Sequence, residues 1–266
     1  MVPKLIFIVP YRDRKEHRQF FTKYMEFIME DYKKEDYEIY FSHQCDNRPF
    51  NRGATKNIGF LAMKNKYPHD YQNITFVFND VDTLPYTKNL LPYETEIGIV
   101  KHFYGFKFAL GGIFSIKGID FEKTNGFPNF WGWSMEDNIM NKRVLEAKLT
   151  INRDVFFTVK SRSVLQFVDG FAKTISKQEV ADYISNRYIE GFKDIKNIKY
   201  TIKDLDINIT SFNTEREATN LRYETHDITK PNASKIRLSH KEKQMYTPGI
   251  QKSPLVNFNS IFSRKR

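Results

Sequence analysis

Three short apolar segments alternate with two helical patterns in the first 79 residues, and this alternation limits the fold more than any other feature. Residues 4–9, 37–42 and 73–79 are rich in β-branched and aromatic side chains, which is typical of buried strands. Between them, residues 11–32 carry apolar side chains at helical spacing, and a second helix is expected over about 51–66. This order predicts an α/β fold with a mostly parallel, doubly wound, Rossmann-like sheet. Ligands of such sheets bind at the carboxyl ends of the strands.

The order of elements changes beyond residue 95. Residues 111–147 predict a strand, a short helix, a loop rich in glycine and aromatic residues, and a longer helix. Residues 176–192 look helical, and short β-like pieces follow residue 195. We therefore expect one α/β domain over 1–195 and a small C-terminal α+β extension over 196–266 that ends in a basic tail.

The charge balance favours an anionic partner. Lys and Arg total 42 against 32 acidic residues, so the formal net charge is +10. Such a charge suits nucleic acid, a membrane surface or a phosphate-bearing small molecule, and it also serves solubility alone. Cys45 is the single cysteine, and the apolar run at 5–10 is too short for a membrane span or a usual signal peptide. We expect a cytoplasmic protein without a membrane span.

Two aspartates, Asp80 and Asp82, directly follow the third apolar segment. Their spacing places both side chains on one face of an extended chain, where two like charges are unfavourable without a nearby cation. Hard divalent ions such as Mn²⁺ or Mg²⁺ take oxygen ligands and leave positions for phosphate oxygens. The pair is therefore typical of a metal that bridges protein and diphosphate, or of a solvated turn with capping acids.

Two further motifs follow the first and second apolar segments. Arg12 and Arg14 in "PYRDR" are suited to pairing with a phosphate or a carboxylate, or they form the charged start of a helix. In "RPFNRGATKN", Phe50 offers a stacking surface for a base, and Arg52 could reach a phosphate or a ribose. An ordinary loop that enters a helix explains the second motif equally well.

The segment "FWGWSMED" contains both tryptophans of the chain and an acidic pair. Its glycine permits hinge motion, and aromatic rings give flat surfaces that suit sugars and bases. Glu136 and Asp137 fall at the amino end of a predicted helix, where acids are electrostatically favoured. They could orient an acceptor hydroxyl and take its proton, or simply stabilise a helix beside a core-packed tryptophan.

Several common motifs are absent from the sequence. It has no Gly-x-Gly-x-x-Gly, no P-loop, no His-Glu-x-x-His and no Cys-x-x-Cys. This disfavours dinucleotide oxidoreductases, P-loop NTPases and common zinc sites.

The motifs taken in order resemble the β-1,4-galactosyltransferase family, glycosyltransferase family 7. The matching segments are "FIVPYRDRKEH", "FNRGATKNIGF", "FVFNDVDTLP" and "GGIFSIKGIDFEKTNGFPNFWGWSMEDN", within about residues 4–145. The resemblance implies a GT-A fold, with a nucleotide-binding half over 1–95 and an acceptor half over 96–195. It also implies a metal-dependent, inverting transfer of a hexose from a UDP-sugar to a hydroxyl group of a glycan or glycoconjugate acceptor. No nucleic-acid partner is then expected.

The resemblance also assigns roles to individual positions. The donor nucleotide would contact Pro10, Tyr11, Arg12, Phe50 and Arg52, with Asp80 near the ribose, Val81 beside it, and Lys101 at the diphosphate. Asp82 would bind Mn²⁺ or Mg²⁺, and Trp133 would close over the donor. Glu136 and Asp137 would bind the acceptor, with Asp137 as the catalytic base.

This chain departs from the family pattern at three places. The histidine metal ligand expected about thirty residues after the acidic pair is absent, and Gln166, Asp169 or His226 is a candidate replacement. Ser134 and Met135 replace two glycines before the acidic pair, which bears on loop mobility. Ala109 stands where the family usually has an aromatic residue, and its smaller side chain could admit an N-acetyl group, so the choice of donor sugar between galactose and N-acetylgalactosamine is open. The missing histidine also keeps a second hypothesis open, in which a catalytically degenerate GT-A-like protein binds glycan or nucleic acid.

Overall fold

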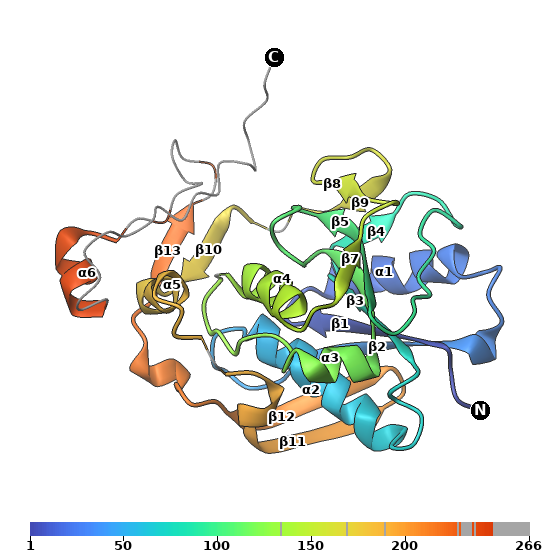
Figure 1. The fold of residues 1–266 in the computed structure, drawn as a ribbon, viewed down its shortest axis with the longest axis horizontal. Coiled ribbons are helices and arrows are strands. Elements are labelled where there is room, and N and C mark those ends of the chain that lie inside the picture. Colours follow the sequence, from blue (N-terminus) through green and yellow to red (C-terminus); the bar gives the residue numbers. More distant parts are fainter. Residues whose placement is uncertain are drawn as a thin grey trace.

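A nine-stranded mixed sheet forms the centre of the part of the chain that the computed structural model describes (Figure 1). The described residues are 1–133, 135–168, 170–188, 190–227, 229, 236 and 238–246. In spatial order the sheet contains β11 (Lys196–Lys203), β12 (Asp206–Asn213), β2 (Tyr37–Gln44), β1 (Leu5–Tyr11), β3 (Thr75–Asn79), β6 (Ile113–Lys117), β5 (Ile99–Gly105) and β7 (Thr150–Asn152), and β8 (Phe157–Thr158) also pairs with β5.

Helices and two small sheets surround this central sheet. The α-helices are α1 (Lys15–Ile28), α2 (Arg52–Lys66), α3 (Gly118–Lys123), α4 (Glu136–Glu146), α5 (Lys177–Ile184) and α6 (His240–Tyr246). Short 3₁₀-helices span Lys34–Asp36, Phe192–Asp194 and Ala218–Asn220. The small sheets pair β4 (Thr83–Pro85) with β9 (Val164–Gln166), and β10 (Ala172–Ile175) with β13 (Glu224–Asp227).

The first half of the chain folds as the alternation of apolar segments predicts. Strands β2, β1 and β3 lie side by side and parallel, with Ile8 of β1 level with Tyr40 and Phe78. Helices α1 and α2 connect them, so each strand ends at the same edge of the sheet as its neighbours. The prediction of a doubly wound, mostly parallel α/β sheet is confirmed. Strand β6 runs antiparallel to β3 and β5, which makes the sheet mixed.

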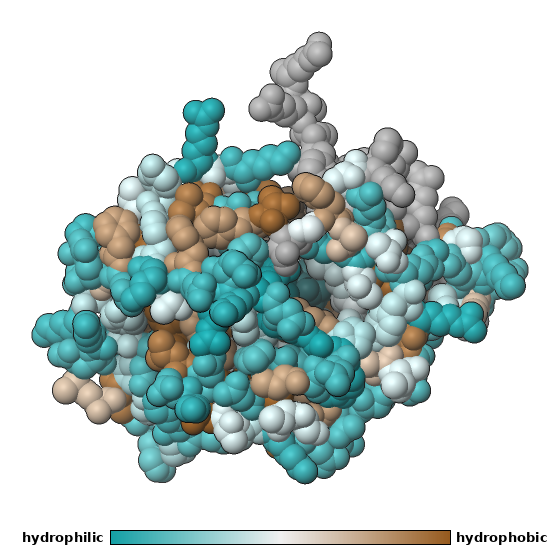
Figure 2. Space-filling model, turned by 180° about the vertical axis from the view of Figure 1, so that it is seen from behind, coloured by the Kyte–Doolittle hydropathy of each residue, from teal (hydrophilic) through white to brown (hydrophobic). Residues whose placement is uncertain are grey.

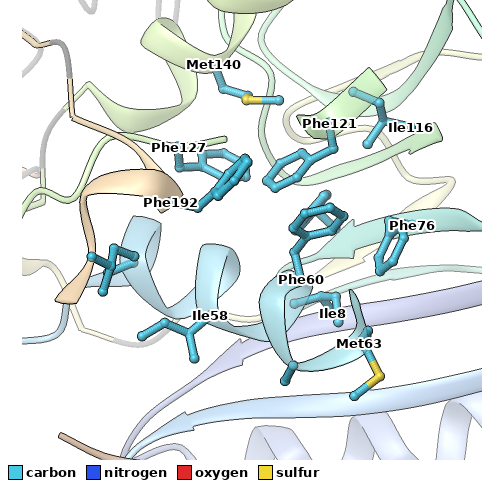
Figure 3. Close-up of a cluster of buried hydrophobic side chains, with 14 of the residues drawn as sticks. Ile8, Ile58, Phe60, Met63, Phe76, Ile116, Phe121, Phe127, Met140 and Phe192 are labelled. Atoms are coloured by element: carbon cyan, nitrogen blue, oxygen red, sulfur yellow. The ribbon is translucent and has the colours of Figure 1, made fainter. Parts of the chain in front are cut away.

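Apolar side chains of β1 alternate between two cores on opposite faces of the sheet. Ile6 and Ile8 pack in the core that includes α2, whereas Phe7 and Val9 pack in the core that includes α1. A strand covered on both faces must be apolar at successive positions, which explains the continuous run of the sequence. Figure 3 shows the first core, where Phe60 of α2 lies among aromatic rings from neighbouring elements.

The segment after residue 195 contributes to the central sheet. Strand β12 pairs in parallel with β2, and β11 pairs with β12 as an antiparallel hairpin. Arg18 of α1 also donates to Asp206 at 2.7 Å. The first strands of the expected C-terminal extension therefore belong to the main sheet, while β13 and α6 lie outside that sheet, near β10 and α5 (Figure 1). The expected basic tail, 253–266, lies outside the described residues.

The second half of the α/β domain follows its predicted order. Strand β6, the short helix α3, a loop and helix α4 occur in sequence, and α4 begins at Glu136 as expected. Helix α5 ends at Ile184 and is shorter than the predicted helix over 176–192.

The described residues contain no helix that is both long enough and apolar enough to cross a membrane. Figure 2 shows hydrophilic residues over most of one face, with smaller hydrophobic patches between them.

We expect the Phe60→Ala variant to lose about 3–5 kcal/mol of unfolding free energy, because the removed ring leaves a cavity. Phe60 is fully buried, with ring centroids of Phe121 at 4.7 Å and Phe76 at 4.9 Å. Urea denaturation measures the loss. Phe27→Ala is the control, because Phe27 is 42% exposed and should change stability by only about 0.5 kcal/mol. Equal losses in the two variants would contradict the packing described for this core.

Candidate active site

A short turn after β3 fixes the positions of Asp80 and Asp82. The Asn79 side chain donates to the carbonyl groups of Asp80 and Thr83, each at 2.8 Å. The amide of Thr83 donates to the Asp80 carbonyl at 3.1 Å, and the Asp80 amide donates to Gly112 at 3.0 Å. The backbone between the two acids is therefore held on both sides, at the carboxyl edge of the parallel strands.

Two cations of helix α2 neutralise Asp80. The Arg52 guanidinium donates to both carboxylate oxygens, at 2.6 and 2.8 Å, and Lys56 Nζ lies 3.4 Å from Oδ1. Burial alone would raise the pKa of Asp80, but Arg52 and Lys56 outweigh it and lower the pKa to about 2. Asp80 is thus an ionised carboxylate bound by protein cations.

Asp82 has a different cationic partner. Arg14 Nη1 donates to Oδ2 at 3.1 Å, and the Thr83 hydroxyl donates to Oδ1 at 2.9 Å. Burial, followed by the charge of Asp80, raises the pKa of Asp82 despite the presence of Arg14. Asp82 is therefore a carboxylate whose charged form a further cation would stabilise.

Arg52 also binds the acidic pair at the start of α4. Its Nη1 donates to Asp137 Oδ1 at 2.9 Å and to Glu136 Oε1 at 3.0 Å. Lys56 Nζ lies 3.7 Å from Asp137 Oδ1. Burial raises the pKa of Glu136, and the charge of Arg52 opposes this increase. One arginine thus joins "NDVD" to "SMED", and the Asp137 side chain remains 26% exposed.

Two glycines allow the loop before β6 to approach this cluster. A Cβ atom at Gly111 would overlap the Asp137 carboxylate, and a Cβ at Gly112 would meet the Tyr104 carbonyl. Gly112 also has a φ of +69°, which side chains disfavour. The Leu110 amide donates to the Asp137 carbonyl at 2.7 Å. The glycine pair therefore lets this loop pack directly against the acidic pair.

His102 of β5 forms hydrogen bonds with the same loop. Its Nδ1 accepts from Arg153 at 3.1 Å, so Nε2 carries the proton and donates to the carbonyls of Tyr104 at 3.0 Å and Gly111 at 3.2 Å. Burial, and then the charge of Arg153, lowers the pKa of His102 to about 4. The imidazole is neutral in the folded protein at neutral pH.

The motif "PYR" lies at the end of β1, close to the loop after β2. Pro10 and Tyr11 are buried, and the Tyr11 ring contacts the His43 ring with centroids 4.9 Å apart. Arg12 donates to the carbonyl of Arg48 and lies 3.8 Å from Asp46. Arg12 therefore stabilises the loop after β2, whereas Arg52 and Arg14 contact the acids of the "NDVD" turn.

Three other predicted donor contacts lie in different surroundings. Phe50 is half-buried and precedes Asn51, which caps helix α2 through the Ala54 amide. The Val81 side chain is buried in the core that includes α1. Lys101 lies in the middle of β5 and donates to the Pro92 carbonyl at 3.2 Å. The structure brings neither the Val81 side chain nor Lys101 into contact with the acids of the site, and their donor-binding roles stay predictions.

The two tryptophans of the chain have different environments. Trp131 is buried, stacks on Phe212 at 5.3 Å, and donates from Nε1 to the Thr214 hydroxyl at 3.0 Å. Trp133 is only partly buried, and its amide donates to Thr174 at 2.7 Å. Core packing therefore explains the first tryptophan, whereas the second remains the candidate for a donor-covering side chain.

Glu179 of α5 holds the backbone of this tryptophan loop. Its two carboxyl oxygens accept from the amides of Trp131 at 2.6 Å and Gly132 at 2.8 Å. The loop is thereby tied to α5 immediately before the acidic pair of α4.

Gln166 is the candidate metal-ligand replacement that the structure places beside Asp82. It pairs with Thr83 in the β4–β9 ladder, and its Oε1 accepts from the Tyr104 hydroxyl at 2.7 Å. His226 lies on β13, opposite Lys173. Asp169 lies outside the described residues. No cluster of three or more His, Cys, Asp or Glu residues that could hold a metal occurs among the residues described.

The sequence prediction did not include three residues of this site. Lys56 pairs with Asp80, Tyr104 donates to Gln166, and His102 donates to the glycine loop that packs against Asp137. Their positions follow from helix and strand packing. Lys56 alone had a sequence signal, because it follows Arg52 by four residues and so shares its helix face. The burial and nearby acids of Tyr104 raise its pKa to about 12.

Comparison with solved structures shows that the fold is that of GT-A glycosyltransferase catalytic domains. The catalytic domain of Drosophila β1,4-galactosyltransferase 7, in complex with xylobiose, superposes with a TM-score of 0.61 at 20% identity, covering 82% of this chain and 97% of that one. A mutant of the same enzyme, in complex with manganese, UDP-Gal and xylobiose, gives a TM-score of 0.58 at 19% identity, with the same coverage. At these identities the likeness shows the fold.

Sequence comparison identifies the family. Residues 2–93 match the N-terminal region of glycosyl transferase group 7, and residues 94–164 match the N-terminal domain of galactosyltransferase. The chain belongs to glycosyltransferase family 7. It is 28% identical to the xylosylprotein 4-β-galactosyltransferase of Caenorhabditis elegans over 225 residues, 78% of this chain and 75% of that protein. It is 32% identical to mouse β-1,4-galactosyltransferase 1 over 160 residues, 56% of this chain but only 39% of the mouse enzyme.

We expect folding stability to fall as the pH decreases from 6.5 to 4, because unfolded chains protonate His102 in this interval while the folded protein keeps it neutral. A pKa difference of this size corresponds to about 3 kcal/mol. Urea denaturation across this pH range should show a smaller decrease in a His102→Gln variant, which keeps a donor to the loop but does not titrate. Parallel pH profiles of the two proteins would contradict the neutral buried imidazole.

Proposed function

We propose that this chain is an inverting, metal-dependent glycosyltransferase that moves a hexose, Gal or GalNAc, from a UDP-sugar to a hydroxyl group of a glycan acceptor. The observation that carries the proposal is the convergence of "NDVD" and "SMED" on Arg52, at the carboxyl edge of the sheet. Relatives named as galactosyltransferases support the proposal, as does the Drosophila mutant that binds manganese, UDP-Gal and xylobiose.

Asp137 is the proposed catalytic base. Its carboxylate is partly exposed, and its backbone is fixed at the start of α4 and by the glycine loop. It takes the proton of the acceptor hydroxyl as the acceptor oxygen attacks the anomeric carbon and UDP leaves from the opposite face. Glu136, more deeply buried beside it, would orient the acceptor.

The donor would lie along the carboxyl ends of β1, β2 and β3. The residues assigned to its nucleotide by family resemblance are Pro10, Tyr11, Arg12, Phe50, Arg52, Asp80, Val81 and Lys101. Trp133 would close over the donor and exclude water, which otherwise competes with the acceptor and hydrolyses the donor. Of these groups, Arg52 is the cation that binds both Asp80, on the proposed donor side, and Asp137, on the proposed acceptor side.

The oxygen donors at this edge fit Mn²⁺ or Mg²⁺. Asp82 is a carboxylate whose charged form burial disfavours, and the amide oxygen of Gln166 lies on the neighbouring strand. Both are oxygen ligands of the kind that these ions prefer. Asp82 and Gln166 would hold the ion, which would supply positive charge to the departing diphosphate.

The acceptor and the location are also part of the proposal. A glycan or glycoconjugate is the expected partner, and no nucleic acid is expected. Ala109 is buried two residues before Gly111, and its small side chain would leave room for an N-acetyl group on the donor. A cytoplasmic location stays a prediction.

We expect the wild-type protein to release UDP from UDP-Gal or UDP-GalNAc in the presence of Mn²⁺ and a panel of glycan acceptors, and Asp137→Asn to reduce that release about 10²- to 10⁴-fold. The same assay is run with UDP-Glc as the donor and, separately, without Mn²⁺. Asp70→Asn, an exposed aspartate change, is the control and should keep full activity. The Asp137 variant should still bind UDP.

The enzyme proposal fails if none of these donors is turned over with any acceptor. In that case, binding of glycans or of nucleic acid by the same preparation tests the hypothesis of a catalytically degenerate protein.

A further inference from the structure

Lys56 is a buried ammonium group inside the site. Its side chain is 1% exposed and lies one helical turn after Arg52 on α2. The ammonium lies 3.4 Å from Asp80 Oδ1, 3.7 Å from Asp137 Oδ1 and 4.6 Å from the centroid of the Phe127 ring. Lysine is almost never fully buried without charged partners, and here two carboxylates and an aromatic face compensate its charge.

Arg52 and Lys56 bind the same two carboxylates, but Lys56 is more deeply buried than Arg52. Arg52 is 18% exposed and contacts Asp80 and Asp137 from the solvent side. Lys56 contacts the same Oδ1 atoms from the protein interior. A bound substrate can therefore reach the guanidinium of Arg52, but it cannot reach the ammonium group of Lys56.

The two carboxylates need a cation throughout the reaction. If the Arg52 guanidinium turns toward the donor, Asp80 and Asp137 lose their shared outer partner. Like charges so close together would then repel each other and favour protonation of one of them. Lys56 is placed to prevent this, because its contacts do not depend on the position of Arg52.

We propose that Lys56 is a positioning residue that keeps the base Asp137 oriented and ionised from beneath the site while Arg52 engages the donor. This inference rests on the proposed function, because Asp137 acts as a base only if transfer occurs. In the transfer step, the acceptor O–H bond breaks and its proton binds to Asp137. The new bond joins the acceptor oxygen to the anomeric carbon, and the bond from that carbon to the UDP oxygen breaks. Lys56 keeps its own proton throughout.

The charged and titratable groups around Asp137 come from four elements. They are Arg52 and Lys56 of α2, Asp80 after β3, Glu136 of α4, and His102 of β5, which interacts electrostatically with Asp137. Arg52 remains in a Lys56 variant, so the variant isolates the inner cation from the outer one.

The test compares Lys56→Met, which removes the charge and keeps the length, with the wild-type protein. We expect kcat/KM for transfer to fall about 10²-fold, the cost of a base that is poorly placed. We also expect the acid side of the pH–activity profile to move to higher pH, because a carboxylate without its cation is protonated more readily. Lys56→Arg should restore the acid side of the profile.

Lys64→Met is the matched control. Lys64 lies two turns further along α2 and pairs with Glu122, away from the acids of the site. This variant should leave both kcat/KM and the pH profile unchanged. Thermal unfolding of each variant separates loss of folded protein from loss of function, and Lys56→Gln replaces the methionine variant if that protein does not fold.

An unchanged pH profile in folded Lys56→Met or Lys56→Gln would overturn the proposal, even if the activity or stability of that variant were reduced. If the wild-type protein itself releases no UDP, the proposed function fails separately. The positioning role is then decided by ¹³C NMR titration of the aspartate carboxyl carbons, with Asp137 assigned from Asp137→Asn. The Asp137 signal should titrate at higher pH in Lys56→Met, and identical titration curves would overturn the proposal.

Discussion

The pairing of Arg52 with three carboxylates is the interaction on which the site depends. Asp80, Glu136 and Asp137 belong to segments more than fifty residues apart, and their charges would repel one another without a shared cation. Arg52 can serve all three because it begins helix α2, directly after the capping residue Asn51. Gly53 then allows the helix to meet the Pro128 carbonyl, where a Cβ atom would overlap it. The local backbone thus fixes the guanidinium between the two acidic motifs.

The charge balance of the site explains how it could receive a nucleotide sugar and a metal. Among the described residues, four acids (Asp80, Asp82, Glu136 and Asp137) face three cations (Arg14, Arg52 and Lys56), which leaves a formal charge of −1. The charge of Asp82 is less fully compensated than that of Asp80, since the pKa of Asp82 is raised while that of Asp80 is lowered. A divalent ion at Asp82 would change the formal charge of the site from negative to positive and so favour the binding of a diphosphate. The protein cations, in turn, keep the carboxylates together before substrate arrives.

The sequence predicted the parallel half of the fold because strands buried on both faces must be continuously apolar. It also predicted that Asp80, Asp82, Glu136 and Asp137 belong to the site, since acids at strand ends and helix starts are recognisable patterns. The place of β12 was not predictable, because pairing with β2 depends on contacts between segments about 165 residues apart. The role of Arg52 as the link between two motifs was also missed, since one side chain can bind a phosphate or a carboxylate with the same geometry. The position of Gln166 opposite Thr83, the residue after Asp82, followed only from the β4–β9 pairing, and its role as a metal ligand stays a prediction.

Calorimetry of UDP binding with and without Mn²⁺ tests the central claim most directly, namely that the acids at this edge form a site for a metal and a diphosphate together. Linkage requires that an ion bound beside the diphosphate increases UDP affinity and that UDP increases ion affinity by the same factor. We predict that Mn²⁺ raises UDP affinity about tenfold or more in the wild-type protein and much less in Asp82→Asn, because a coupling free energy of 1.4 kcal/mol already gives a factor of ten. Equal UDP affinity of the wild-type protein in the presence and absence of Mn²⁺ would contradict the account.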